Sequence, residues 1–296
     1  MAGFLTQLSP RAAAYRLATS DRFERLVRAI PWAEQRAYRA ARRYVAGTSL
    51  EDALATVRGL RDDGLTASLD LFGEGLTDSG AIGQVVDAYL RAAKEVESLG
   101  ADVYLEVAPS HLGLDVSADL LRTQLERLLE AMPSESRLQV SAEESWRTGR
   151  IIEVVIALGR QGAPVVATVQ ANLRRSEMDV ERLAEAAVPV RLAKGAYLES
   201  PDVAYPWGEP TDLAFLRLAH QLRAAGSELA IATHDRVIRE ALLAALPGVQ
   251  IEMLLGVRSR DARELARRGH DVRIYVPYGE EWFRCWMRRV AESVGV

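Results

Sequence analysis

The order of apolar and polar positions changes character near residue 46. Over residues 1–45 the apolar residues recur at helical spacing among many arginines and alanines, and strand signals are absent. From residue 46 to residue 296, short runs rich in β-forming residues alternate with longer amphipathic stretches, which often close with a glycine before the next run. The pattern predicts an N-terminal helical arm (1–45) followed by strand–helix repeats (46–296).

Eight strand-like runs can be counted after the arm. They cover residues 66–72, 101–108, 137–142, 164–170, 188–194, 228–233, 249–254 and 271–276. Eight strand–helix units in about 250 residues match the α/β fold of the (β/α)8 TIM-type barrel in number and in length. A doubly wound open sheet is the alternative, but no GxGxxG motif follows the first run. We therefore predict a (β/α)8 barrel preceded by a helical arm.

Composition narrows the class of protein. The 296 residues are 49% hydrophobic and 26% charged, which excludes disordered, collagen-like and membrane-spanning chains. The single cysteine, Cys285, cannot form an internal disulfide, so a cytoplasmic location suits the chain. The net charge of −4 offers no basic field for nucleic acid. We expect no nucleic-acid partner.

Polar residues gather where the strands end, and barrel active sites lie at the carboxyl ends of the strands. In chain order these residues are Asp70, Glu74, Ser110, His111, Ser141, Glu143, Glu144, Gln170, Asn172, Arg191, Lys194, Tyr197, Thr233, His234, Asp235, Glu252, Tyr275 and Tyr278. Their positions predict an active site at the mouth of the barrel.

Two of these residues, Lys194 and His234, have side chains that can act as catalytic groups or bind a ligand. Lys194 is one of only two lysines, and its type fits a Schiff-base nucleophile, a charge for phosphate, or a solvating charge at a strand end. Gly195 follows it and would let backbone amides approach a ligand. His234 fits a cofactor contact, a general base or a structural histidine. With four histidines in the whole chain, we expect no metal site.

A pair of arginines stands in the last amphipathic stretch. Arg288 and Arg289 lie one helical turn before Glu292. One interpretation is a surface ion pair, which contributes little to stability. The other is that two guanidinium groups face the barrel mouth and bind a carboxylate. Spacing leaves both open.

Several segments at these strand ends resemble the proline dehydrogenase family of FAD enzymes, in particular its short monofunctional bacterial members. The segments are SLDLFGE (68–74), VQANLRRSEMDVERL (169–183), VRLAKGAYLE (190–199), ATHD (232–235), EMLLGVR (252–258) and VRIYVPYGEEWFRCWMRRVAE (272–292). Their order and spacing cover almost the whole predicted barrel. The combination of RLAKGAY, THD and RIYVPYG with the arginine pair makes the resemblance specific.

The resemblance implies a flavoenzyme with noncovalent FAD at the barrel mouth. Such an enzyme takes a hydride from the ring carbon beside the proline nitrogen, forms 1-pyrroline-5-carboxylate, and passes electrons to a quinone or another acceptor. The implied catalytic residues are Arg191, near flavin N5, with Tyr197 and Tyr275. The implied cofactor contacts are Gln170, Arg191, Lys194, Gly195, Ala196, Thr233 and His234. The implied substrate contacts are Leu254, Tyr197, Tyr275, Arg288, Arg289 and Glu292, with Glu74 as a gate partner for one arginine.

The chain departs from the family pattern beside the substrate. Ala108 stands where the family has a lysine, and Ser141 stands where it has an aspartate. Loss of only one member would leave an unpaired charge in a pocket with little water, which is destabilising. Loss of both members avoids this cost. Asn172 replaces a usual tyrosine and Asp235 a usual asparagine. We therefore predict that the substrate is either L-proline or a related small amino acid or amine.

Two other functions stay open from the residues. One is a Schiff-base aldolase or lyase that uses Lys194. The other is a flavin-binding barrel that has lost turnover, which the departures at Ala108 and Ser141 motivate. We expect the protein to be cytoplasmic, either free in the cytoplasm or in peripheral contact with the inner face of a membrane.

Overall fold

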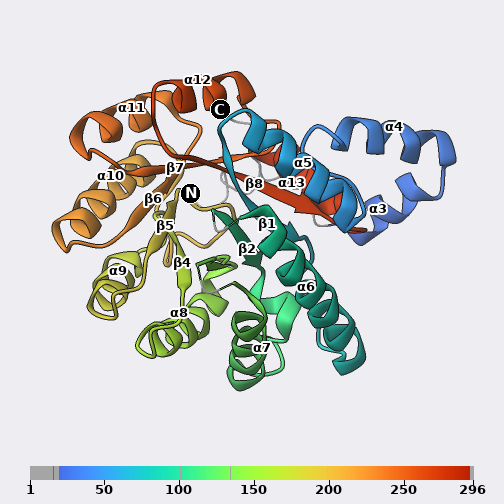
Figure 1. Cartoon of the computed structure of the whole chain (residues 1–296), viewed down its shortest axis with the longest axis horizontal. Coiled ribbons are helices and arrows are strands. Elements are labelled where there is room, and N and C mark those ends of the chain that lie inside the picture. The colour runs from blue at the N-terminus through green and yellow to red at the C-terminus, as the bar shows by residue number, and fades with distance from the viewer. Residues whose placement is uncertain (1–15, 17–19, 101, 134, 294–296) are drawn as a thin grey trace.

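The strands form one closed barrel. The computed structural model of the chain describes residue 16 and residues 20–100, 102–133 and 135–293. Its strands are β1 (Thr66–Leu71), β2 (Val103–Val107), β3 (Leu138–Val140), β4 (Val165–Gln170), β5 (Val190–Ala193), β6 (Leu229–Ala232), β7 (Gln250–Leu254) and β8 (Val272–Tyr278). All neighbours pair in parallel and β8 closes on β1 (Figure 1). The eight predicted strands and the (β/α)8 fold are confirmed.

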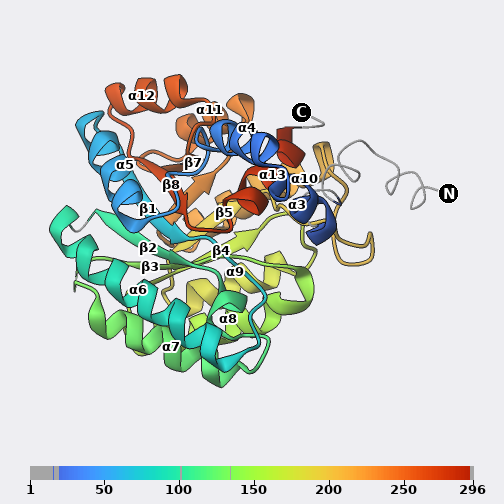
Figure 2. The ribbon, with the colours of Figure 1, turned by 90° about the vertical axis from the view of Figure 1, so that its right-hand side faces the viewer.

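Amphipathic helices surround the barrel (Figures 1 and 2). After β1 they are α6 (Ser79–Leu99), α7 (Ala118–Ala131), α8 (Ser145–Gly159), α9 (Ser176–Glu185), α10 (Glu209–Ala224), α11 (Arg236–Ala245), α12 (Ser259–Arg267) and α13 (Trp282–Ser293). A short 3-10 turn, η1 (Pro109–Leu112), follows β2. Each predicted amphipathic stretch contains one helix, because its apolar stripe must be buried against the strands.

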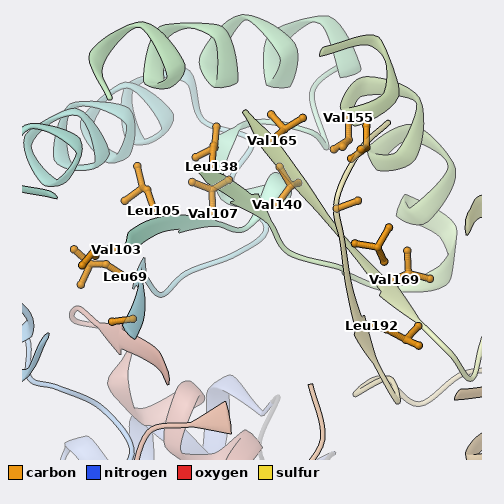
Figure 3. Packing of buried hydrophobic residues seen from close by; sticks show 14 of the residues in the cluster. Leu69, Val103, Leu105, Val107, Leu138, Val140, Val155, Val165, Val169 and Leu192 are labelled. Carbon is orange, nitrogen blue, oxygen red and sulfur yellow. The ribbon is translucent and has the colours of Figure 1, made fainter. Parts of the chain in front are cut away.

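Side chains alternate between the two faces of the barrel wall. The apolar positions point outward and fill the layer between strands and helices, where Figure 3 shows Leu105, Leu138 and Val155. Many of the positions between them are polar and face the lumen, as Glu106 and Gln139 do. The lumen therefore holds a polar layer, and the hydrophobic core lies outside the strands.

Within the described residues, three helices precede β1. They are α3 (Asp21–Arg28), α4 (Pro31–Ala41) and α5 (Leu50–Asp62). The helix α5 packs on the outside of β1 and β8. Because that place is filled, α13 packs against α4 instead, with a separate apolar cluster that includes Ala41, Phe72 and Trp282. The division of the chain at residue 45 stays a prediction, and most of residues 1–19 lie outside the described part.

Candidate active site

A layer of buried polar side chains crosses the lumen below the mouth. Arg191 on β5 is bound by Glu106 on β2, with 2.9 Å from Nη1 to Oε2 and 2.5 Å from Nη2 to Oε1. Its Nε donates to Thr168 Oγ1 at 3.0 Å, and Nη1 also reaches Glu252 Oε2 at 3.3 Å. These partners lie on strands that are mostly not neighbours of β5. The guanidinium therefore projects into the lumen, where its charge is balanced by carboxylates.

A second buried group joins β1 and β8. Tyr275 donates its hydroxyl hydrogen to Asp70 Oδ2 at 2.5 Å, and Tyr89 of α6 donates to Asp70 Oδ1 at 3.1 Å. Burial, reinforced by the negative charge of Glu106, raises the pKa of Asp70 to about 7. Burial and Asp70 also raise the pKa of Tyr275, so this phenol stays protonated at neutral pH. Tyr275 is thus held at the barrel wall as a neutral hydrogen-bonding side chain.

The helix α13 brings Arg288 to the mouth of the barrel. Its guanidinium lies 5.4 Å from the ring centre of Phe72, just after β1, and 5.4 Å from that of Tyr197, after β5. Glu74 in the loop after β1 accepts a hydrogen bond from Arg288 Nη2. Since the side chain of Arg288 is only 14% exposed, the guanidinium is largely withdrawn from solvent. Of the two interpretations of this arginine, the geometry matches the one that places it at the mouth.

Gln170 connects the loop after β3 to the loop after β5. Its Nε2 donates to the carbonyl of Glu143 at 2.8 Å, and its Oε1 accepts from the backbone N–H of Ala196 at 3.3 Å. The Glu143 carboxylate accepts from Ser110 Oγ at 2.5 Å, and burial raises the pKa of Glu143 to about 7. Gln170 therefore sets the relative positions of the loops after β3 and β5.

Lys194 is engaged by two carboxylates. Its Nζ lies 3.0 Å from Asp235 Oδ2 and 2.5 Å from Asp212 Oδ1. Asp235 also caps α11, because its Oδ1 accepts from the N–H groups of Val237 and Ile238. Burial opposes ionisation of Asp235, but the bonds from Lys194 and the helix outweigh it and lower its pKa. The departure at Asp235 is thus a paired charge. Both of these contacts of the Lys194 Nζ are with carboxylates of this chain, so the group is engaged within the protein, whereas a Schiff-base nucleophile must be available to the substrate.

His234 has a structural bond in addition to any role at the mouth. Its Nε2 accepts from the backbone N–H of Leu254 at 3.1 Å. Burial, with the nearby charge of Arg289, lowers the pKa of His234 to about 4. The ring is therefore neutral at pH 7 and carries its proton on Nδ1. It fixes the loop after β6 to the end of β7, where the predicted pocket residue Leu254 lies.

Gly195 is required by a close approach within the protein. It has a φ of 113°, and a Cβ at this position would lie 2.1 Å from Asn172 Oδ1. The sequence predicts that Gly195 lets a ligand approach the backbone. In the structure the side chain of Asn172 already requires a glycine at this position. Asn172 is 2% exposed, and its Oδ1 has no hydrogen-bond partner within the described residues. An orphaned buried acceptor beside a backbone amide fits a ligand that presents an N–H group.

The structure thus gathers most of the predicted site residues at one end of the barrel. Thr233 is buried there and accepts from the N–H of Asp235 at 3.1 Å. Ala108 and Ser141 follow β2 and β3, and the Ser141 hydroxyl binds Glu106 Oε1 at 2.6 Å. Arg289 lies on α13 next to Arg288, and the side chain of Glu292 lies outside the described part of the structure.

Sequence reasoning missed Glu106 and Gln139. Both are inward positions of strands whose neighbours in sequence are apolar, as in LEV and LQV. A polar residue between two buried apolar residues of a strand was the available signal, because successive side chains face opposite sides.

The described residues contain neither a metal-binding cluster nor a membrane-spanning helix. No group of three or more histidine, cysteine, aspartate or glutamate side chains there is arranged to hold a metal ion. Among the helices described, none combines the length and apolar character needed to cross a membrane.

Comparison with known proteins places this site in context. The family model described as "Proline dehydrogenase" matches residues 53–292. "Proline dehydrogenase 1" of Bacillus subtilis subsp. natto is 33% identical over 260 residues, covering 85% of this chain and 86% of that protein. "Proline dehydrogenase" of Deinococcus radiodurans is 32% identical over 274 residues, covering 88% of each.

A solved structure shares the fold. Proline utilization A (PutA) of Bdellovibrio bacteriovorus, inactivated by N-propargylglycine, superposes with a TM-score of 0.81 at 18% identity. The match covers 100% of this chain but 37% of that longer one. At this identity the likeness supports the barrel architecture alone.

Proposed function

Because the chain belongs to the proline dehydrogenase family, we propose that it oxidises the C–N bond of L-proline to 1-pyrroline-5-carboxylate with bound FAD. The family consists of oxidoreductases that act on CH–NH donors. The observation that carries the proposal is Arg288, a largely buried guanidinium at the barrel mouth between Phe72 and Tyr197. Such a group suits the carboxylate of an amino acid.

The residues at the mouth fit a flavin. The orphaned Asn172 oxygen offers an acceptor, and Arg191 and Lys194 offer positive charge. We propose that FAD binds noncovalently against Arg191 and these further residues: Gln170, Lys194, Gly195, Ala196, Thr233 and His234. The cofactor, when bound, accepts the hydride that proline loses.

The other side chains position the substrate. Arg288 and Arg289 bind its carboxylate, and a clamp of this kind holds the reacting carbon in place. Tyr197, Leu254 and Tyr275 form the walls, and Glu74 pairs with Arg288 until substrate displaces it. Glu292 would orient the arginines. A quinone or another acceptor would then reoxidise the cofactor, in solution or at a membrane surface.

The substrate itself is the finer part of the proposal. Ala108 and Ser141 leave out a lysine and an aspartate that the family pattern has at these positions. A related small amino acid or amine is therefore tested beside proline. The lyase alternative has no support from the site, since Lys194 is paired with two carboxylates. Loss of turnover is likewise unsupported.

Anaerobic mixing of the flavin-loaded protein with small amines tests the function. We expect L-proline to bleach the flavin absorbance, because the substrate delivers two electrons while no acceptor is present. D-proline and pipecolate serve as matched controls for stereochemistry and ring size. Bleaching by another amine but not by proline would move the substrate to that amine. No bleaching by any would contradict the dehydrogenase proposal.

We also expect heat or acid denaturation to release the flavin. The proposed contacts are polar and noncovalent, and the cysteine of the chain, Cys285, is buried in the cluster with Phe283 on α13. After precipitation the colour should be found in the supernatant. Colour that stays with the pellet would show a covalent link.

A further inference from the structure

One carboxylate sets the direction of the Arg191 guanidinium. Glu106 accepts two parallel bonds from it, at 2.9 Å and 2.5 Å. Glu252 accepts only one, at 3.3 Å. A bidentate pair fixes both the plane and the distance of a guanidinium, whereas a single long bond fixes neither. The orientation of Arg191 therefore depends on Glu106.

Glu106 is itself held rigidly. It is 1% exposed, and its Oε2 accepts from Ser68 Oγ at 3.0 Å and from Gln139 Nε2 at 3.1 Å. Its Oε1 accepts from Ser141 Oγ at 2.6 Å. Every partner is a donor, which matches a carboxylate anion. Turning this side chain would break bonds to both neighbouring strands.

Glu252 holds Arg191 less firmly than Glu106 does. Arg191 Nη1 and Gln139 Nε2 each bond to one oxygen of Glu106 and to one oxygen of Glu252. Two carboxylates that share the same donors repel each other when both are charged. Burial raises the pKa of Glu252, so this carboxyl takes up a proton more readily than it would in water.

We propose that Glu106 is a positioning residue for the reaction, which holds the Arg191 guanidinium in the orientation needed beside the flavin. The inference rests on the proposed function, because it takes Arg191 as a cofactor contact. Ser141 takes part, since its hydroxyl binds Glu106. A fixed anion thus lies one layer below the positions where Ala108 and Ser141 leave out a charge pair.

The test compares Glu106→Gln with Glu252→Gln in the flavin-loaded enzyme. A glutamine at position 106 keeps the size of the side chain but removes its charge and one of its two acceptor oxygens. We expect kcat per bound flavin to fall at least about tenfold, with KM for proline within about twofold, because Arg288 is untouched. The matched Glu252→Gln change keeps an acceptor oxygen for the single 3.3 Å bond from Arg191 and leaves the bidentate pair with Glu106 in place, so it should lower kcat by less than about threefold.

A second readout needs no substrate. The midpoint potential of the bound flavin, measured with a chemical reductant, should become more positive in Glu106→Gln because an anion near the cofactor is lost. In Glu252→Gln the shift should be smaller, because burial disfavours the charged form of Glu252 in the wild type. This comparison tests Glu106 even if proline fails to reduce the wild-type enzyme, which would contradict the proposed function alone.

Two results would overturn the inference. One is an equal change of kcat and potential in both variants. The other is a lower flavin content in Glu106→Gln with unchanged kcat per flavin and unchanged potential, which would make Glu106 purely structural. If Glu106→Gln does not fold, Glu106→Asp keeps the charge but retracts it by one methylene. A kcat below that of the wild type supports positioning, and a wild-type kcat contradicts it.

Discussion

Arg288→Met should weaken substrate binding by about 2 to 4 kcal/mol, the usual loss when one partner of a desolvated charged hydrogen bond is removed. The guanidinium at the mouth is 14% exposed and faces Phe72 and Tyr197, so water cannot replace it efficiently. Methionine keeps an unbranched chain of similar length. The loss should be seen in KM for proline, or in the amount of proline that half-reduces the flavin.

The flavin content of the variant distinguishes a role of Arg288 in substrate binding from a role in maintaining the fold. We expect it to stay near the wild-type value in Arg288→Met and in Arg289→Met, because the proposed cofactor contacts lie on other elements. Arg267→Met on α12 is the matched control, since this side chain is 70% exposed and pairs with Glu264 on its own helix. Unchanged affinity in both variants at positions 288 and 289 would show that the arginines do not bind the substrate. Lost flavin would assign them a structural role.

Asp70→Asn should remove a pH dependence of stability. The folded-state pKa of Asp70 is raised from 3.8 to about 7, first by burial and then by Glu106. Between these values the folded protein keeps a proton that the unfolded chain has released. The free energy of unfolding therefore falls as the pH rises through this window. From pH 5 to pH 8 this carboxyl should cost about 2 to 3 kcal/mol in the wild type.

Chemical denaturation at pH 5 and pH 8 measures this difference. The asparagine cannot titrate, so the wild-type loss should shrink by that amount, whatever the absolute stability of the variant. Tyr275→Phe is the matched control, because it removes the hydrogen bond that lowers the pKa of Asp70. In that variant the fall should extend to higher pH. An identical pH dependence in the wild type and Asp70→Asn would refute the assignment.

The sequence by itself determined the barrel and the family. The number and position of the strands follow from the local sequence, since each strand is a short run of β-forming residues between longer amphipathic stretches. Segments such as VRLAKGAYLE and VRIYVPYGEE also identified the mouth of the barrel, because strand ends meet there whatever the packing of the rest. The sequence also indicated that both members of a charge pair are missing, at Ala108 and Ser141. It did not indicate that Glu106 lies next to these positions.

Only the tertiary structure decided how the charges pair. Glu106 meets Arg191, and Gln139 meets Glu106, because three different strands turn their inward faces to one lumen. Lys194 meets two aspartates from different loops, and Gly195 is required by a side chain from the preceding strand–helix unit. Arg288 reaches the mouth because α5 already fills the outside of β1 and β8. Strand periodicity specifies which face a residue takes, whereas pairing across a closed barrel depends on its register and on which helix fills each place.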